Sequence, residues 1–588
     1  MHIKITSIFY VILIIIISSV SYTNIIKNEF VWDDPKFVSW AGAKDFNDIY
    51  NFFKGEVPEG HGGVYRPLRS IFYVISYKLW KLNPVGYHLQ SILIHLISTI
   101  LIYFIVLNIT EKRIIGFMSA LLFGVHPIHT ETITSITGSF DIIGVIFFLI
   151  SFYLYLKASS SENQYNIKYV LSIIFALFAF LTYELTLTLP LLIILYEFCF
   201  KKIKKKGIIR KIKAYSLYFV IMSFYFFTRY IILKVPGRAN YLANSFYFTM
   251  LTMTKAFLKY ILLVLFPISP NVNHTISEGI LSLAYADFNE KAILAQSLFD
   301  LHILFATAVI AVLFIIAIKS FNKYPIVSFC IGWFFIGLAP VLNIIPQGSI
   351  LSEKYLYISS FGFCLLFSYG IHQIYNITHN KMKYVKVVLI LFFIITTIAY
   401  SMQTFSRNKD WKNELTLWSK TVEQSPNSAL AHNNIGVVYQ KQGNIDLAID
   451  VYKQAIALNP NYAEAYNNLG LVYQSQGKTK LAVEAYQKAL ALNQNPAFHN
   501  NLGIAYQIQG KLELAIEEYK KALSIQDNYA SHNNLAIAYY NLGKKDIAIE
   551  EYKKALKINP NYLEAHKNVY FNYDTTLGNI SHKDANYS

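Results

Sequence analysis

The stretches VILIIIISSV (Val11–Val20) and VVLILFFIITTIAY (Val387–Tyr400) decide the fold, because neither contains a charged residue. Of the 588 residues, 54% are hydrophobic and only 15% are charged, whereas about a quarter of the residues in a soluble domain are charged. A helix of about 20 apolar residues crosses the hydrocarbon core of a bilayer. The sequence therefore predicts a polytopic membrane protein and excludes a soluble enzyme, a disordered chain and, with three Cys, a disulfide framework.

The membrane-spanning helices are predicted from the apolar runs. The stretch 251–268 is ambiguous, since Lys255 and Lys259 would be costly at the middle of a bilayer. We expect it to be interfacial or re-entrant, which leaves about eleven crossings. The expected spans are residues 3–23, 87–109, 114–130, 141–158, 167–183, 185–200, 215–233, 299–318, 325–343, 355–377 and 384–404.

The positive charge indicates the orientation of these spans. From Trp411 onward, 17 basic and 16 acidic residues nearly cancel, so almost all of the net charge of +17 belongs to the membrane half. Eight of the thirteen residues in KKIKKKGIIRKIK (Lys201–Lys213) are basic, and such loops between spans lie in the cytoplasm. This predicts a cytoplasmic N-terminus and a C-terminal part on the other side, and it gives no reason to expect a nucleic-acid partner.

The C-terminal part is a repeat array. NNIGVVY (Asn433), NNLGLVY (Asn467), NNLGIAY (Asn500) and NNLAIAY (Asn533) recur at spacings of 34, 33 and 33 residues, which is the pattern of tetratricopeptide repeats (TPRs). The predicted fold is all-α, a polytopic transmembrane helix bundle followed by a TPR α-solenoid. The expected boundaries are a transmembrane domain at 1–404 with an outer loop at 24–86, a connecting half-repeat at 405–425, the TPR domain at 426–570 and a tail at 571–588.

On this topology, the ionisable residues of the membrane half gather on the outer face. Charges at a membrane edge are costly and usually functional, so we expect them to line one pocket. Two adjacent carboxylates can provide a general base, and cations can hold a phosphate. The candidates are Asp33 and Asp34 for catalysis, Arg66, Arg229 and Lys354 for a lipid phosphate, and His126, His129, Glu131, Asp141, Glu184 and Glu353 as further pocket residues.

Structural roles remain open for several of these residues. Asp33 and Asp34 precede Pro35 and could form a turn and a helix cap. Arg229 could anchor its span at the interface. His126 could end a helix, since a His-x-x-His pattern with a nearby Glu is too loose to define a metal site. Whether a divalent metal is required stays open.

Five motifs resemble one family. WDDPKFV, VYRPLRSI with KLNPVGYHLQSILIHL, LLFGVHPIHTETITSITGSFD, EKYLYISSFGF and RNKDWKNELTLW are similar to the transmembrane-and-TPR O-mannosyltransferases and their prokaryotic relatives. The resemblance runs in order over nearly the whole chain. It implies a GT-C fold, a polyprenyl-phosphate sugar as donor and an acidic pair at the active site, here Asp33 and Asp34.

The chain departs from the family pattern in three places. Relatives usually carry Gly-Arg-x-Asp where this chain has Ser139 before Phe140-Asp141, and Lys-Glu where it has Tyr183-Glu184. The usual Glu-Arg-Tyr is here Glu353-Lys354-Tyr355, which keeps a charge but loses the bidentate guanidinium fork. Two expected cations are absent, which affects the predicted lipid-phosphate site.

The repeats carry a second candidate site. One Asn occupies the same place in each repeat and is expected to form a ladder along the groove, resembling the asparagine ladder of the O-GlcNAc transferases. An amide can pair with a peptide backbone without reading side chains; alternatively these residues are a solvated part of the TPR consensus. The residues are Asn434, Asn468, Asn501 and Asn534.

The predicted function is therefore that of a membrane glycosyltransferase. It is expected to transfer a sugar, with mannose implied by the resemblance, from a polyprenyl phosphate to a hydroxyl of a protein acceptor that the TPRs present on the non-cytoplasmic side. The alternatives are a non-enzymatic TPR scaffold in the membrane and a polysaccharide polymerase or ligase. The Ile-, Lys- and Asn-rich usage favours a prokaryotic plasma membrane, with the endoplasmic reticulum as the alternative.

Overall fold

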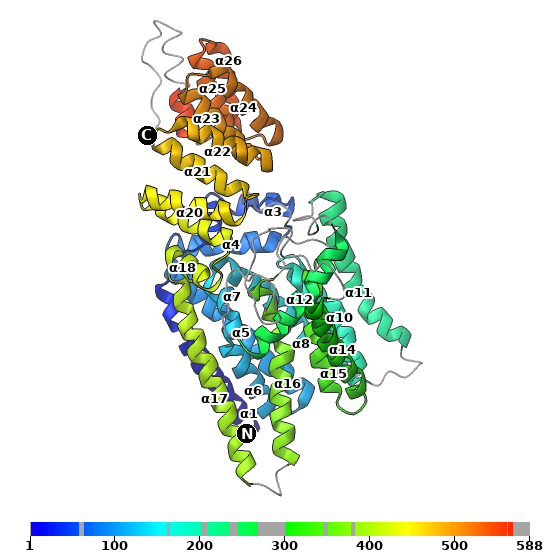
Figure 1. Ribbon diagram of the computed structural model, residues 1–588. Helices are drawn as coiled ribbons and strands as arrows, with labels where there is room; N and C mark the ends of the chain where they lie inside the picture. Colours follow the sequence, from blue (N-terminus) through cyan, green and yellow to red (C-terminus); the bar gives the residue numbers. More distant parts are fainter. Residues whose placement is uncertain are drawn as a thin grey trace. The chain divides into compact units, whose positions relative to one another are not determined.

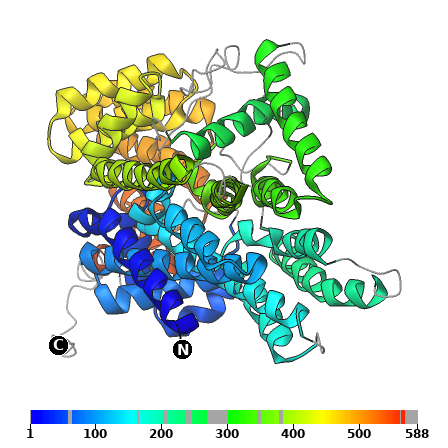
Figure 2. The same ribbon diagram turned by 90° about the horizontal axis from the view of Figure 1, so that it is seen from below.

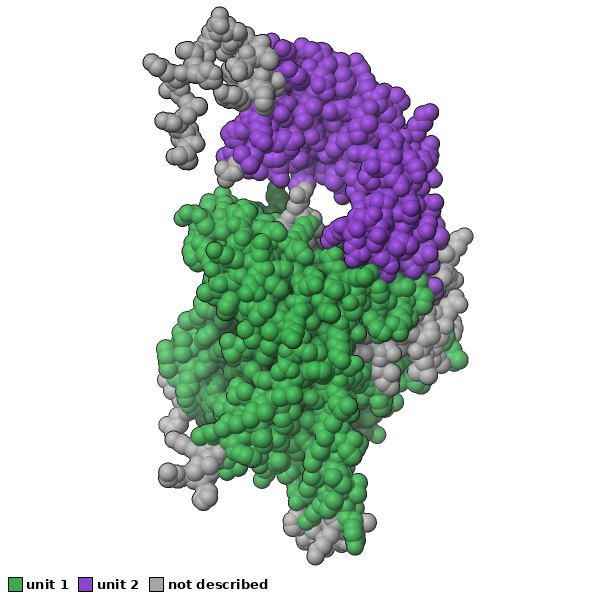
Figure 3. All heavy atoms as spheres, turned by 90° about the vertical axis from the view of Figure 1, so that its left-hand side faces the viewer, with its two compact units in different colours: residues 1–286, 290–426 green, residues 287–289, 427–588 purple. Residues whose placement is uncertain are grey.

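The computed structural model divides into two compact units. It describes residues 2–57, 64–161, 165–201, 208–235, 241, 245–267, 300–344, 351–377, 383–560 and 562–568. Apart from residues 287–289, which lie outside this part, the first unit ends at Pro426 and the second begins at Asn427 (Figure 3). Within the described residues all regular structure is helical, so the predicted all-α fold is confirmed.

The first unit is a helix bundle (Figures 1 and 2). Each of the eleven predicted spans overlaps an apolar helix, although four of these helices have only 12 to 14 residues. Its helices are α1 (His2–Tyr22), α2 (Asp34–Gly42), α3 (Ile49–Phe53), α4 (Pro67–Trp80), α5 (Pro84–Thr110), α6 (Arg113–Val125), α7 (Thr130–Thr134), α8 (Ile136–Ser159), α9 (Ile167–Phe180), α10 (Leu189–Phe200), α11 (Ile208–Phe226), α12 (Phe246–Leu265), α14 (Leu301–Ser320), α15 (Pro325–Leu338), α16 (Leu356–Ile377), α17 (Lys383–Arg407) and α18 (Glu414–Gln424).

Seven helical stretches of this unit are long and apolar enough to cross a membrane. They support a multi-pass membrane protein. The stretches are Thr6–Lys27, Pro84–Thr110, Ile136–Ser159, Ala214–Ile232, Phe246–Leu265, Leu301–Ser320 and Tyr384–Trp411.

Helix α12 qualifies by composition, but its contacts favour a course along one end of the bundle. Met253 accepts a hydrogen bond from Asn343, and Tyr260 accepts one from the Ser352 backbone N–H. Both partners belong to the connection between α15 and α16. The last carbonyl of α12, at Leu265, accepts from Tyr400 near the end of α17. Because both halves of α12 meet the same end, the arrangement supports the prediction that 251–268 does not cross.

The two ends of the bundle differ in charge. At one end, Lys201 contacts the end of α8 through Ser160, and Lys386 lies 5.3 Å from the ring of Tyr375 at the end of α16. The helix ends here also carry further lysines and arginines of the predicted cytoplasmic loops. At the other end, Ser21 and Ser401 bind each other at 2.6 Å, so α1 and α17 lie side by side and finish together.

The connecting segment 405–425 packs into the first unit. Helix α17 continues to Arg407, and α18 follows after a short turn. Trp418 of α18 is buried and lies edge-on to Trp32 of the first outer loop, with ring centroids 5.7 Å apart. The Glu29 N–H donates to the Lys412 carbonyl at 2.9 Å. The half-repeat thus covers the loop that carries Asp33 and Asp34.

The second unit consists of helix pairs, and the first three repeats share one packing between a glycine and a tyrosine ring. The ring of Tyr452 fills the space above Gly436, where a Cβ atom would lie 2.5 Å from it. Gly443, in the turn between the two helices of the pair, has a φ of +78°, which glycine adopts without strain. The described helices are α19 (Ala429–Lys441), α20 (Ile445–Leu458), α21 (Ala463–Ser475), α22 (Thr479–Leu492), α23 (Pro496–Ile508), α24 (Leu512–Ile525), α25 (Tyr529–Asn541) and α26 (Lys545–Ile558).

Candidate active site at one end of the helix bundle

Asp34 ties the first outer loop to the start of α8. Its carboxylate accepts a hydrogen bond from the Thr137 N–H at 2.9 Å and lies 3.5 Å from the Ser135 hydroxyl. A carboxylate is favoured at a helix N-terminus by the exposed N–H groups and the helix dipole. Asp34 is nevertheless fully buried, and this burial raises its pKa to about 7, against the opposing effect of the backbone hydrogen bonds. Its charge therefore changes close to neutral pH.

Asp33 lies beside Asp34 in a different environment. It is only half-buried, and its carbonyl accepts from the Lys36 and Phe37 N–H groups at the start of α2. Its side chain does not cap that helix, which removes the cap as its structural role. Of the two aspartates, Asp33 is the one that solvent reaches.

Arg66 joins two carboxylates that are far apart in the sequence. Its Nη1 donates to Asp141 Oδ1 at 2.8 Å, and its Nε donates to Glu184 Oε2 at 2.5 Å. Arg229, on a π-helical turn after α11, places its Nη1 3.6 Å from Glu184 Oε1. Arg66 and Arg229 are 9% and 4% exposed, so these charges interact with little solvent screening.

Arg69 belongs to the same network, although sequence reasoning missed it. Its Nε lies 3.2 Å from Asp141 Oδ1, and its Nη2 donates to the Thr137 carbonyl at 2.9 Å. Arg69 therefore links Asp141 to the residue whose N–H holds Asp34. The signal was present, because Arg66 and Arg69 are three residues apart at the start of α4, a spacing that places side chains on one face.

A second buried ionic cluster surrounds α7. Glu131 Oε1 accepts from the Ser352 hydroxyl at 2.9 Å, and Glu353 pairs with Arg407. Burial raises the pKa of Glu131 to about 7, although the charge of Lys354 acts in the opposite direction. The Ser135 N–H donates to the Glu131 carbonyl, so this cluster is attached to the same turn as Asp34.

Arg407 is the second charged residue that the sequence reasoning missed. Besides Glu353, it donates to the carbonyl of Pro127 at 3.3 Å. Arg407 is the first residue of the motif RNKDW, but it lies 54 positions from Glu353 in the sequence. Only the packing of α17 beside the start of α16 brings the two together.

The two histidines of the pattern His-x-x-His lie in tightly packed surroundings. His126 bonds to the Val264 carbonyl and accepts from the Ile128 N–H. His129 lies 2.9 Å from both the Phe123 carbonyl and the Ser360 hydroxyl. Both are fully buried, and all four ring nitrogens contact protein atoms. In the part of the chain that the structure describes, no three His, Cys, Asp or Glu residues are placed to hold a metal ion.

The two positions that lack an expected cation are both buried. Ser139 donates to the Ile136 carbonyl within α8. The ring of Tyr183 lies 5.0 Å from the Arg66 guanidinium, an arrangement that stabilises a cation. Tyr183 thus supports Arg66 instead of adding a charge of its own.

The asparagines of the second unit connect successive repeats. Asn468 donates to Asn433 at 2.9 Å, and Asn501 donates to Asn467 at the same distance. Asn534 donates to Asn500 at 3.0 Å. Each of these three amides therefore uses one N–H group in a bond between repeats and is half-buried. The ladder prediction did not include these bonds.

Comparisons with known proteins agree with both units. Residues 66–229 match the family described as dolichyl-phosphate-mannose-protein mannosyltransferase, and residues 429–495 and 496–559 match the tetratricopeptide repeat family. A protein O-mannosyl-transferase of Caenorhabditis elegans is 26% identical over 450 residues, which cover 74% of this chain and 60% of that protein. Protein O-mannosyl-transferase TMTC3 of Mus musculus is 25% identical over 426 residues, covering 66% and 44%.

The chain thus spans about half the length of these relatives. Among solved structures, a crystal structure of MamA protein is 28% identical, with a TM-score of 0.23, and the match covers 26% of this chain and 83% of that one. The mannosyltransferase match contains Arg66, Asp141, Glu184 and Arg229. The resemblance predicted from the motifs is therefore confirmed: the chain is related to the protein O-mannosyl-transferases and joins a mannosyltransferase-family segment to tetratricopeptide repeats.

Proposed function

We propose that the protein is a membrane glycosyltransferase that transfers a sugar from a polyprenyl phosphate to a hydroxyl group of a protein acceptor. The printed names of the relatives, protein O-mannosyl-transferases, favour mannose as the sugar. The observation that carries the proposal is the buried arginine–carboxylate network next to the Asp33–Asp34 pair.

The charges of this network suit a reaction that releases a phosphate. Among the described residues, the guanidinium groups of Arg66, Arg69 and Arg229 contact the carboxylates of Asp141 and Glu184. The positive excess, held away from water, stabilises an anion that develops as the bond to the sugar breaks. Asp34 lies on the adjoining turn and is fully buried. Burying its neutral, protonated form costs less free energy than burying its charged form.

The reaction needs one base. The acceptor oxygen attacks the anomeric carbon of the sugar, the carbon–oxygen bond to the phosphate breaks, and its electron pair stays on the phosphate oxygen. The proton of the acceptor hydroxyl passes to a carboxylate. We assign this task to Asp33, because it is the more exposed of the pair and a base must reach its proton directly or through one water. Asp34 is then a positioning residue that fixes the loop on α8.

The donor phosphate is assigned to the cations around this loop. Arg66 is held by two carboxylates and keeps Asp141 and Glu184 in place, whereas Lys354 is half-buried beside the Glu131 cluster. Arg229 and Lys354 are therefore the side chains proposed to meet the phosphate. Glu131 and Glu353 hold these groups in position, and His126 and His129 brace the turn beside them.

The side of the membrane follows from the charged ends of the bundle. The end with the exposed lysines is assigned to the cytoplasm, so the site faces the non-cytoplasmic side of a prokaryotic plasma membrane or of the endoplasmic reticulum. The TPR unit is proposed to hold the protein acceptor. Asn468, Asn501 and Asn534 each donate one N–H group to the inter-repeat bond. An amide has a second N–H group and a carbonyl oxygen, and these can pair with a peptide backbone.

The test is sugar transfer by the purified chain in lipid vesicles. Radiolabelled polyprenyl-phosphate mannose and a membrane-protein extract from cells lacking the protein are supplied, and label released from protein by β-elimination is measured. We expect O-linked label with the wild-type chain and background label with the double variant D33N/D34N. Equal label from both chains would exclude this site, and label in free polysaccharide instead of protein would favour a polymerase.

A further inference from the structure

A groove lies at the basic end of the bundle, away from the candidate active site. It has a volume of about 880 Å³ and runs between α1, α5 and the start of α6. Its walls are apolar, with Ile8, Ile12 and Leu107 among them, and Ser7 adds a hydroxyl. Ile8 and Ile12 are 59% and 48% exposed, so the groove opens on the surface that faces the lipid.

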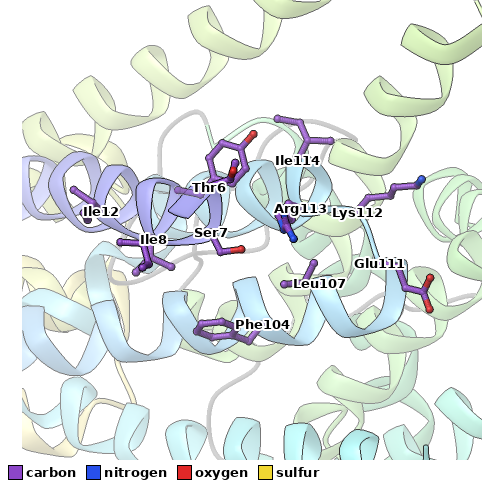
Figure 4. A pocket seen from close by; sticks show the side chains of 12 residues that line it. Thr6, Ser7, Ile8, Ile12, Phe104, Leu107, Glu111, Lys112, Arg113 and Ile114 are labelled. Atoms are coloured by element: carbon purple, nitrogen blue, oxygen red, sulfur yellow. The ribbon is translucent and has the colours of Figure 1, made fainter. Parts of the chain in front are cut away.

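Two cations stand at the rim of this groove. Lys112 and Arg113 line it at the turn between α5 and α6, and Figure 4 shows Arg113 between the helices that carry Ser7 and Leu107. Glu111 also belongs to the rim; it is exposed, and its carboxylate points away from the middle of the groove (Figure 4). The three side chains together leave one positive charge in excess.

The start of α6 adds to the attraction for an anion. Arg113 is the first residue of this 13-residue helix, Lys112 is its N-cap, no side chain caps the helix, and its first turn contains no acidic residue. Cations are unfavourable at the positive end of a helix dipole, whereas an anion is stabilised there. An anion bound at this turn would therefore interact favourably with the side chains of Lys112 and Arg113 and with the positive end of the α6 dipole.

A second groove serves as an internal comparison. It lies on the other side of Ile114, between α6, α16 and α17, and has a volume of about 810 Å³. Its described lining is also apolar, including Phe117, Leu121 and Phe393, but contains no Lys or Arg. The two grooves share size and hydrophobicity and differ in charge.

We propose that the first groove binds an anionic phospholipid. The phosphate lies against Arg113 and Lys112, and the acyl chains lie along Ile8, Ile12 and Leu107. Apolar walls alone would accept any lipid, so the charge complementarity at the rim decides the class. The site belongs to the leaflet on the basic end, and it is separate from the donor site of the proposed function, which lies at the other end of the bundle.

The test uses the whole 588-residue chain in a neutral detergent. It is titrated with phosphatidylglycerol or with phosphatidylcholine of identical acyl chains, and bound lipids are counted by native mass spectrometry. We expect phosphatidylglycerol to bind roughly five- to thirtyfold more tightly, as two cations at a membrane surface provide. The variant K112Q/R113Q should lose this preference, whereas K157Q/K168Q, which removes two charges outside the groove lining, should keep it.

Two tryptophan variants and a competing ligand extend this test. The variant L107W fills the groove without changing its charge and should reduce phosphatidylglycerol binding, while L121W in the second groove should not. Equal binding of the two lipids by the wild-type chain would overturn the proposal even if every variant misfolds. Competition by glycerol 3-phosphate as strong as that by the lipid would also overturn it, because the site would then bind a free phosphate without using its apolar walls.

Discussion

The two ends of the helix bundle hold their charged residues in opposite environments. At the end with Asp34, arginines and carboxylates from distant helices are buried and paired with one another. At the other end, Lys168, Lys319 and Lys323 are exposed. An exposed surface charge contributes little to stability. The buried charges are costly, and their cost is consistent with a site for chemistry.

Removing one buried cation should have the largest effect on stability. Arg66→Met leaves Asp141 and Glu184 without their shared partner, which should lower the free energy of unfolding by about 3–5 kcal/mol. The measurement is thermal unfolding in detergent. Lys168→Met at the other end is the matched control and should change stability by less than about 0.5 kcal/mol. Similar effects of the two variants would show that the ends do not differ as described.

The stability of the buried-charge end should also depend on pH. Asp34 has its pKa raised by burial from 3.8 to about 7, so the folded state binds its proton more tightly than the unfolded state. The protonated Asp34 side chain therefore stabilises the folded state. This contribution to the free energy of unfolding is complete below about pH 4 and is lost as the pH rises through 7. Between pH 5 and pH 8 this amounts to about 2–3 kcal/mol.

The variant D34N should lack this part of the pH dependence and should be more stable than wild type at pH 8. The pKa of Glu131 is also raised to about 7, so E131Q should likewise lose part of the pH dependence and be more stable than wild type at pH 8. Melting temperatures at the two pH values provide the measurement. If the melting temperatures of D34N and wild type depended on pH in the same way, burial would not raise the pKa of Asp34 in the folded protein.

The smallest expected effect extends the comparison to the TPR unit. Asn468 and Asn434 occupy the same repeat position, but only Asn468 has a preceding asparagine to bind, at 2.9 Å. Asn468→Ala should cost about 0.5–1.5 kcal/mol, and Asn434→Ala should cost less. Chemical denaturation of the whole chain, followed by fluorescence of a probe on the repeats, measures both. If both variants lost the same free energy of unfolding, the bond between Asn468 and Asn433 would not contribute to stability.

The sequence was sufficient for features that depend on local patterns. Apolar runs and the repeat at Asn433 and its counterparts determine where helices form, because burial of an apolar face is a local requirement. The charge of the loops likewise separated the two ends of the bundle. The Asp33–Asp34 pair and Arg66 are recognisable as candidates because ionisable residues at a membrane edge are costly.

The partners of these residues could not be found in the same way. Arg69 with Asp141 and Arg407 with Glu353 are pairs of residues from different helices, and their approach depends on tertiary packing. The same holds for the burial of Asp34 against Thr137. Hydropathy alone places α12 among the possible spans, whereas Lys255 and Lys259 predict that it does not cross, and its contacts with the connection between α15 and α16 support that prediction.

We assign sugar transfer to the paired aspartates at the buried-charge end, with Asp33 as the base. The most direct measurement is the rate of transfer from polyprenyl-phosphate mannose to protein by wild type and by D33N, with melting temperatures measured alongside. With Asp33 as the base, we expect D33N to lose about 10²–10⁴-fold in rate at an unchanged melting temperature. A D33N variant that transfers sugar at the wild-type rate would contradict this assignment.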